Sequence, residues 1–268
     1  MDGSLGASPT AMRFAHRWVG PPVLARLRAE VTGRERVPTS GGVLFAANHR
    51  SFLDHYLLTA ASPRPMRFLA KAELAHGLAG RFHTTMGMIT VERGTADLDV
   101  LDLIAGLLRA GEAVGVFPEG TRSPTGQLFR FRRGLARLAA AARVPVVPVG
   151  LVGTAQVWPR GQRPSWRRPD PGVLAVRFGE VVGPPEDTPR ARRDLTATVY
   201  ERVADLCGQP RANRFAPVSG ERTPWGRGLA RPDITGPTPD RSPLPFANAV
   251  VAREPWRRLG RRQSRHGA

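Results

Sequence analysis

The stretch "VLFAANHRSFLDHYLL", residues 43–58, joins an apolar run to a helical run through a short polar segment. The first five letters, 43–47, are typical of a buried strand, and an apolar helical pattern occupies 53–61. His49 follows the strand, and Asp54 lies on the first turn of the expected helix. The stretch therefore predicts a strand–turn–helix unit that carries His49 and Asp54 just past the carboxyl end of the strand.

The spacing of His49 and Asp54 is compatible with a catalytic pair. Five residues rotate about 140° around an ideal helix, so two helical residues at this spacing would not share a face. If His49 lies in the turn, the Asp54 carboxylate can reach back to the imidazole, fix its tautomer and stabilise the imidazolium. These are the roles of a general base and the residue that orients it. Taken alone, a pair at this spacing is more often a capping aspartate beside an ordinary polar histidine.

The region 43–182 continues to alternate between strand-like and helical patterns. Short apolar, β-branched runs occur at 43–47, 66–70, 87–91, 113–117, 144–152 and 173–178. Helical patterns occur at 53–61, 73–83, 95–110 and 133–142, and a last one near 190–207. This alternation predicts an α/β fold with a largely parallel sheet flanked by helices. Active sites of such sheets lie beyond the carboxyl ends of the strands, where His49 is expected.

Composition divides the chain into three parts. Residues 1–29 mix aromatic and apolar side chains with arginines, and Pro21 and Pro22 are expected to break them into two short amphipathic helices. This part is either a membrane-interfacial element or a helix packed on the domain's own core. Residues 30–207 form the α/β domain. Residues 208–268 are rich in Pro and Gly and carry twelve Arg against four acids, which predicts a mostly disordered basic tail.

The charge of the chain points to an anionic partner. The formal net charge is +18 over 268 residues, which fits nucleic acid, anionic lipid or phosphorylated metabolites. Cys207 is the sole cysteine, so an intrachain disulfide and a cysteine-based zinc site are excluded. No apolar stretch approaches the roughly 18–20 residues that span a bilayer, and the first residues lack a signal-peptide layout. The sequence therefore predicts a soluble or peripheral protein.

Two further strand ends carry candidate anion ligands. The segment "FPEGTRS", 117–123, ends a strand with Glu119, Gly120, Thr121 and Arg122. A glycine turn lets backbone amides approach a phosphate, and a guanidinium can grip its oxygens. The segment "GMITVER" ends another strand with Arg93 as a possible second ligand. Surface ion pairs are the alternative interpretation of these arginines. P-loop, zinc-protease and nucleophile-elbow motifs are missing from the sequence.

The ordered segments "NHRSFLD", "GMITVER", "FPEGTRS" and "VPVVPV" resemble the four sequence blocks of the glycerolipid acyltransferases, in particular the 1-acylglycerol-3-phosphate acyltransferases. The resemblance covers about residues 30–205. It implies a glycerol-3-phosphate acyltransferase-like fold in which His49 is the general base and Asp54 supports it, without an acyl-enzyme. It also implies acceptor-binding roles for the residues that match the second and third blocks, namely Arg93, Glu119, Gly120, Thr121 and Arg122.

The resemblance implies transfer of a fatty acyl group from acyl-CoA or acyl-carrier protein to the 2-hydroxyl of 1-acylglycerol-3-phosphate, giving phosphatidic acid for phospholipid biosynthesis. No metal or prosthetic cofactor is expected. Many bacterial members have an N-terminal membrane helix, but the matching stretch here is short and rich in Arg. The expected location is the cytoplasmic face of the cell membrane, bound peripherally, or the cytoplasm.

Two alternatives stay open at this point. One is an acyltransferase for another acceptor, such as glycerol-3-phosphate, a different lysophospholipid or a glycolipid. The other is a non-catalytic protein that binds anionic membranes or nucleic acid. Binding alone needs neither His49 nor Asp54, so the second alternative is disfavoured and nucleic acid is not expected as a partner.

Overall fold

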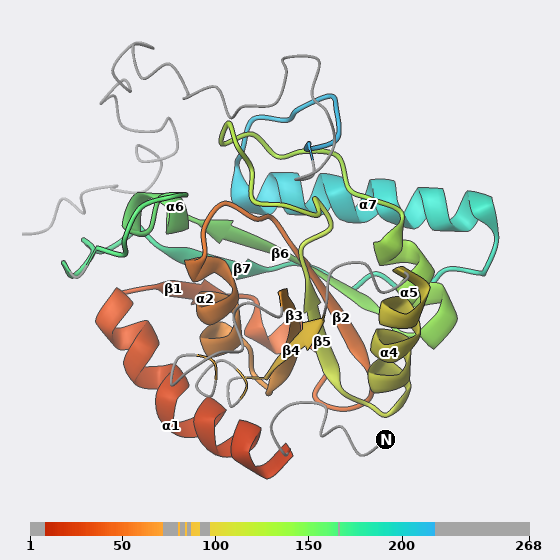
Figure 1. Cartoon of the computed structure of the whole chain (residues 1–268), viewed down its shortest axis with the longest axis horizontal. Helices are drawn as coiled ribbons and strands as arrows, with labels where there is room; N and C mark the ends of the chain where they lie inside the picture. The colour runs from red at the N-terminus through yellow and green to blue at the C-terminus, as the bar shows by residue number, and fades with distance from the viewer. Residues whose placement is uncertain are drawn as a thin grey trace, which may run out of the picture. The chain divides into compact units, whose positions relative to one another are not determined.

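The sheet at the centre of the chain has seven strands. The computed structural model describes residues 9–71, 80, 84, 87–91, 97–165 and 167–217. All of them belong to one compact unit, Met1–Glu221. The strand order is β1-β7-β6-β2-β5-β3-β4 (Figure 1). The strands are β1 (Glu30–Thr32), β2 (Val43–Ala47), β3 (Met66–Lys71), β4 (Met88–Val91), β5 (Ala113–Val116), β6 (Val146–Val152) and β7 (Ala175–Phe178).

The five strands from β6 to β4 in this order are mutually parallel. The strand β7 is antiparallel to β6, and the short edge strand β1 is parallel to β7. The predicted α/β fold with a largely parallel sheet is therefore confirmed. The edge strand β1 and the reversal at β7 were not predicted, because neither is marked by the periodicity of the sequence.

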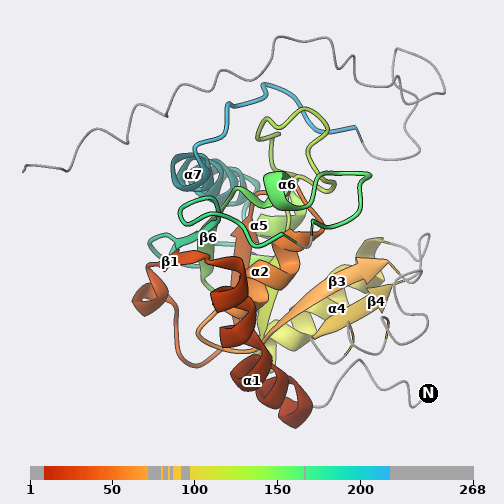
Figure 2. The ribbon, with the colours of Figure 1, turned by 90° about the vertical axis from the view of Figure 1, so that its left-hand side faces the viewer.

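Helices cover both faces of the sheet (Figures 1 and 2). On one face lie α4, α5 and α7, and on the other lie α1 and α2. The helices are α1 (Pro9–Leu27), α2 (Leu53–Ala61), α4 (Asp97–Arg109), α5 (Gly134–Ala142), the short α6 (Thr154–Val157), α7 (Pro189–Cys207) and the 3₁₀ turn η1 (Arg34–Arg36). The predicted helix over 73–83 lies outside the described residues, apart from residue 80.

The central strand β2 shows why this sheet needs helices on both sides. Leu44 and Ala46 pack in the cluster with α4, α5 and α7, whereas Val43, Phe45 and Ala47 pack in the cluster with α2. All five side chains are fully buried. A strand buried on both faces reads as a continuous apolar run, which is how this strand appears in the sequence.

The expected break at Pro21 and Pro22 is wrong, because α1 is a single helix that contains both prolines. Each proline removes one helical hydrogen bond. Packing on α2 opposes this loss, since Gly20 lies against the backbone of Ala60 and the side chains of Met12 and Ala15 are buried. In the described residues, no helix combines the length and the apolar character that crossing a membrane requires.

The ordered domain extends beyond the predicted boundary at residue 207. Residues 208–217 run along the loop before α5 and exchange backbone hydrogen bonds with it. The Leu128 amide donates to the Pro210 carbonyl and the Ala212 amide to the Leu128 carbonyl, both at 2.8 Å. These contacts are made by the main chain and by small side chains, so no apolar pattern marks them. The remainder of the predicted tail, 218–268, lies outside the described residues.

Candidate active site

The parallel pairing of β2 with β5 brings two of the predicted motifs together. Ala46 of β2 lies opposite Val116 of β5, so the segments that follow both strands leave the same edge of the sheet. His49 follows β2 and Glu119 follows β5, and they are directly hydrogen-bonded. This edge is where open α/β sheets place their ligands.

His49 and Asp54 form an oriented pair. The His49 Nδ1 atom lies 2.8 Å from Asp54 Oδ2, and the same carboxylate oxygen accepts hydrogen bonds from the amides of Arg50 (2.6 Å) and Ser51 (2.8 Å). Asp54 is fully buried, whereas the His49 side chain is 18% exposed. Since Nδ1 must donate to a carboxylate, the neutral His49 ring carries its lone pair on Nε2. The ring stacks on Phe117, with centroids 4.0 Å apart, which further fixes its plane.

Glu119 holds the backbone of the loop that bears His49. The carboxylate is fully buried, and its two oxygens accept hydrogen bonds from the amides of His49 (2.8 Å) and Phe129 (2.9 Å). Burial raises the pKa of Glu119 to about 7, although both amides favour the ionised form. The resemblance implied an acceptor contact for Glu119, and this contact stays a prediction. In the structure, both carboxylate oxygens accept hydrogen bonds from backbone amides, so the group positions the loop.

Gly120 makes the turn that follows Glu119. Its φ of 78° lies in the left-handed region, and a Cβ atom there would come within 2.9 Å of the Arg132 Nε atom. Only glycine combines this backbone conformation with this close contact. Thr121 comes next and is half-buried, and its hydroxyl makes no hydrogen bond to the part of the chain that the structure describes. It is thus available to a ligand.

Three arginines gather around the His49 loop. Burial lowers the pKa of Arg122, and the neighbouring charge of Arg160 lowers it further. The Arg160 guanidinium donates to the Arg122 carbonyl at 2.9 Å. Arg50 adjoins His49 in sequence, and its guanidinium lies over the turn at Gly126. Among the described residues, the guanidinium groups of Arg50 and Arg122 have no hydrogen-bonding partner, so both are available to an anion.

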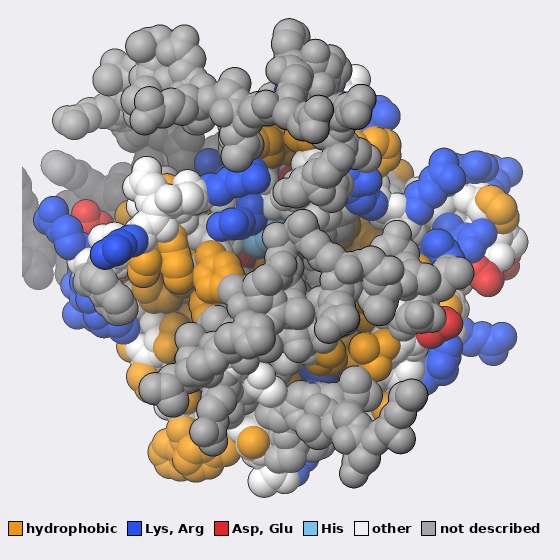
Figure 3. Space-filling view, in the orientation of Figure 1, with side chains coloured by type: hydrophobic (Ala, Val, Ile, Leu, Met, Phe, Trp, Pro, Cys, Tyr) orange, Lys and Arg blue, Asp and Glu red, His pale blue; other side chains and the backbone are white. Residues whose placement is uncertain are grey.

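Sequence reasoning missed Arg50 and Arg160. Arg50 occupies a position of the first block that does not define the motif, and Arg160 comes from a loop with no recognisable pattern. The cation predicted from the second block, Arg93, lies outside the described residues. In the space-filling view, basic side chains lie beside a histidine next to α2 (Figure 3).

Hydrogen bonds from three other segments fix the start of the loop. Asn48 exchanges two hydrogen bonds with the backbone of Leu151 on β6, at 2.8 and 2.7 Å, and donates to Gln209 at 2.6 Å. The Ser51 hydroxyl donates to the Trp158 carbonyl at 2.7 Å. Asn48 and Ser51 therefore act on the loop and not on a ligand.

The arrangement can remove a proton from a hydroxyl group next to an anion. Nε2 of His49 is the acceptor, Asp54 stabilises the resulting imidazolium, and Arg50 and Arg122 supply positive charge nearby. Within the described ranges, no group of three or more His, Cys, Asp or Glu side chains could hold a metal ion.

Known proteins resemble this chain in both sequence and structure. A family model described as "Acyltransferase" matches residues 28–152. The 1-acyl-sn-glycerol-3-phosphate acyltransferase of Pseudomonas aeruginosa is 30% identical over 192 residues, which cover 69% of this chain and 72% of that protein. The chloroplastic enzyme BAT2 of Brassica napus, named for the same activity, is 32% identical over 152 residues, or 55% of this chain.

The coverage of these relatives differs. The chain spans less than half the length of the chloroplastic relatives it matches, at 44% and 42%. Among solved structures, it resembles the 1-acyl-sn-glycerophosphate acyltransferase PlsC from Thermotoga maritima, with a TM-score of 0.58 and 25% identity. That match covers 73% of this chain and 79% of the other.

We predict that Glu119→Gln changes the pH dependence of the protein's stability and loosens the loop that bears His49. The native state holds the Glu119 proton up to about pH 7, but the unfolded chain releases it near pH 4.5, so the wild type loses stability as the pH rises between these values. The free energy of unfolding, measured in urea, should therefore fall in the wild type but not in the variant. The difference between the two proteins should change by about 3 kcal/mol in favour of the variant from pH 4 to pH 8. The glutamine amide cannot accept from both backbone amides. Hydrogen exchange of His49 or Phe129 should thus be faster in the variant above pH 7.

Glu180 provides the control, since it is an exposed glutamate whose side chain is 71% accessible. Glu180→Gln should leave the pH profile of stability parallel to that of the wild type. A parallel profile for Glu119→Gln as well would show that Glu119 ionises normally in the folded protein.

Proposed function

Because the chain belongs to the glycerolipid acyltransferase family, we propose that it transfers a fatty acyl group from an acyl thioester to the 2-hydroxyl of 1-acylglycerol-3-phosphate, giving phosphatidic acid. The observation that carries this proposal is the His49–Asp54 pair beside Arg50 and Arg122. The names of the Pseudomonas and Brassica relatives and of the Thermotoga structure support the choice of acceptor.

In the proposed reaction, His49 acts as the general base. Its Nε2 atom takes the proton of the acceptor hydroxyl as the oxygen attacks the thioester carbonyl. The carbon–sulfur bond then breaks, and the departing thiolate takes the proton back from the imidazolium. Asp54 lies 2.8 Å from Nδ1 and stabilises the imidazolium between these two steps. The reaction is a direct transfer in which no acyl-enzyme forms, and it calls for no metal or prosthetic cofactor.

The phosphate of the acceptor is proposed to bind the arginines of the site. Arg122 and Arg50 have free guanidinium groups in the described part of the chain, and Arg160 adds a third charge. Arginine suits this task because its planar donors match phosphate oxygens in pairs. Thr121 and Arg93, predicted from the sequence, complete the proposed acceptor site. The buried Glu119 supports the turn that carries Gly120 and Thr121.

The protein is also proposed to bind the cytoplasmic face of a membrane through α1. Phe14 and Trp18 are 66% and 63% exposed, and their rings lie 6.3 Å apart on one side of the helix. Arg13 and Arg17 are exposed beside them. Orange side chains are prominent over the region of α1 in Figure 3. Aromatic side chains flanked by arginine are typical of helices that lie in the interface of an anionic bilayer.

We predict that His49→Ala abolishes transfer without unfolding the protein. In the variant, the Asp54 carboxylate keeps the two amide donors of Arg50 and Ser51, so the loop retains its shape. The assay is thiol release from long-chain acyl-CoA, or from acyl-carrier protein, in the presence of 1-acylglycerol-3-phosphate. Loss of a general base should reduce kcat at least about 100-fold. A variant with near wild-type turnover and an unchanged Tm would rule out His49 as the base.

We predict that Arg122→Ala weakens binding of the acceptor. The KM for 1-acylglycerol-3-phosphate should rise about tenfold to a hundredfold, because a charge-assisted hydrogen bond contributes about 1.5–3 kcal/mol. The KM for the acyl donor should not change. Arg109 ends α4 near the opposite edge of the sheet, so Arg109→Ala serves as a control for charge loss. An unchanged acceptor KM in Arg122→Ala would contradict the assignment, and a panel of acceptors would then identify the preferred head group.

We predict that the double variant Phe14→Ala/Trp18→Ala reduces membrane binding. Each aromatic side chain contributes about 1.5–3 kcal/mol when buried, so the affinity for anionic vesicles should fall at least about tenfold. Sedimentation with vesicles measures this affinity. Turnover of a short-chain acceptor dissolved below its micelle concentration should not change, since α1 lies outside the site. Equal sedimentation of variant and wild type would exclude α1 as the membrane-binding element.

A further inference from the structure

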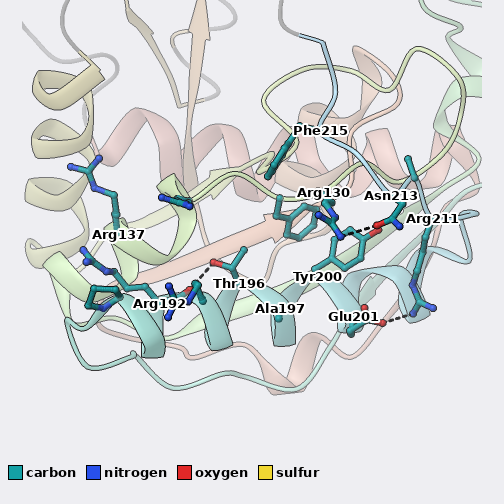
Figure 4. A pocket seen from close by; sticks show the side chains of 15 residues that line it. Arg130, Arg137, Arg192, Thr196, Ala197, Tyr200, Glu201, Arg211, Asn213 and Phe215 are labelled. Carbon is teal, nitrogen blue, oxygen red and sulfur yellow. Dashed lines mark hydrogen bonds and ion pairs between the residues drawn. The ribbon is translucent and has the colours of Figure 1, made fainter.

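A large cavity with six arginines lies outside the site described above. Its volume is about 940 Å³, and it is lined by the start of α5, one side of α7 and the segments 130–133 and 211–215 (Figure 4). The arginines among its 15 lining residues are Arg130, Arg133, Arg137, Arg192, Arg193 and Arg211. Blue side chains also gather over the α7 end of the molecule in Figure 3.

The positive charge of this cavity is largely uncompensated. Its single acidic residue, Glu201, forms an ion pair with Arg211 at 2.6 Å. Arg192 pairs with Asp187, which lies outside the lining, at 3.2 Å. By contrast, Arg133, Arg137 and Arg193 make no ion pair or side-chain hydrogen bond within the described residues. Three unpaired guanidinium groups around one cavity favour a ligand with several negative charges.

Two helices begin at the same cavity. Arg133 is the N-cap of α5 and Arg137 lies in its first turn, while Pro189, Arg192 and Arg193 come from the start of α7. Neither first turn contains an acid. The N-terminal end of a helix carries partial positive charge. Arginines placed there are repelled by this charge, whereas a bound anion is stabilised by it. The N-terminal ends of α5 and α7 therefore add to the positive potential that the arginines create in the cavity.

Aromatic side chains form part of the remaining wall. Phe131 and Tyr200 meet edge to face, with ring centroids 5.2 Å apart, and Phe215 is half-exposed at the cavity. Figure 4 shows Arg137 and Arg192 at one end, with Tyr200 and Phe215 farther along. Aromatic rings next to arginines suit a planar base joined to phosphates. The volume also falls within the roughly 300–1,000 Å³ of small-molecule sites, larger than one phosphate needs.

A single hydrogen-bonded loop connects this cavity with His49. Phe129, whose amide donates to Glu119, directly precedes Arg130 and Phe131 of the cavity wall. The other oxygen of Glu119 holds the His49 amide. In coenzyme A, a long flexible arm separates the nucleotide from the thioester, so the nucleotide requires a site distinct from the one that contains the base.

We propose that this cavity binds the phosphorylated adenine nucleotide of coenzyme A, with the phosphates at Arg133 and Arg193 and the base against the aromatic wall. The proposal rests on the acyl transfer proposed above and selects acyl-CoA over acyl-carrier protein as the donor. A concave site with aromatic walls favours a small planar ligand, whereas an acidic carrier protein would need a broad exposed surface.

Titration calorimetry of the full chain with free coenzyme A tests the proposal. The variant Arg133→Ala/Arg193→Ala removes two cations that make no hydrogen bond or ion pair with the described chain. Its affinity for coenzyme A should fall at least tenfold, and dephospho-coenzyme A should bind the wild type more weakly than coenzyme A does. Arg190 is the matched control, because it lies on the first turn of α7 with 88% of its side chain exposed and does not line the cavity.

The calorimetry and the turnover assays together decide the proposal. The control variant Arg190→Ala should bind coenzyme A like the wild type. Equal affinity of the double variant and the wild type, or no binding of coenzyme A to the wild type, would overturn the proposal. Loss of turnover by the double variant with acyl-carrier protein alone would assign the arginines to docking of an acidic protein instead. Calorimetry requires no turnover, so binding without any acyl transfer would support the cavity and contradict the proposed function.

Discussion

The geometry of the site depends on one buried carboxylate. Glu119 accepts hydrogen bonds from the amides of His49 and Phe129 and thereby joins the segments that follow β2 and β5. Removing a carboxylate from water is costly, and the raised pKa of Glu119 reflects this cost. The left-handed turn at Gly120 then carries the chain away over Arg132. The ionised carboxylate therefore lowers the stability of the protein while it holds the His49 loop in place, a compromise typical of functional sites.

The C-terminal segment extends this network. Gln209 accepts from Asn48 and donates to the Gly126 carbonyl, so one side chain ties the loop after β2 to the loop after β5. Beyond it, Leu128 exchanges backbone hydrogen bonds with the segment 208–217. The loop that bears His49 is therefore held from β5, from β6 and from the C-terminal segment. If His49 is the general base, as proposed, an imidazole fixed in this way needs little reorganisation when it takes a proton.

Much of this fold could be predicted from the sequence, because its central strands are buried on both faces and its helices are amphipathic. The strand 43–47 and the helix 53–61 were predicted at their observed bounds, and the pairing of His49 with Asp54 follows from that unit. What could not be predicted depends on tertiary contacts. Packing on α2 keeps α1 continuous through its prolines, and main-chain hydrogen bonds order 208–217. The role of Glu119 depends on amides whose direction no motif encodes.

In the proposed reaction, the distribution of charge would let one basic chain bind two anionic substrates at different places. Arg50 and Arg122 lie beside His49, where a phosphate on the proposed acceptor would place the neighbouring hydroxyl near the imidazole. The arginines at the starts of α5 and α7 lie in a separate cavity, connected to the base through Phe129 and Glu119. If donor and acceptor bind as proposed, separate sites would keep their negative charges apart, and the repulsion between these charges would otherwise oppose simultaneous binding. Direct transfer without an acyl-enzyme requires both substrates at once, so this separation is what such a mechanism demands of the fold.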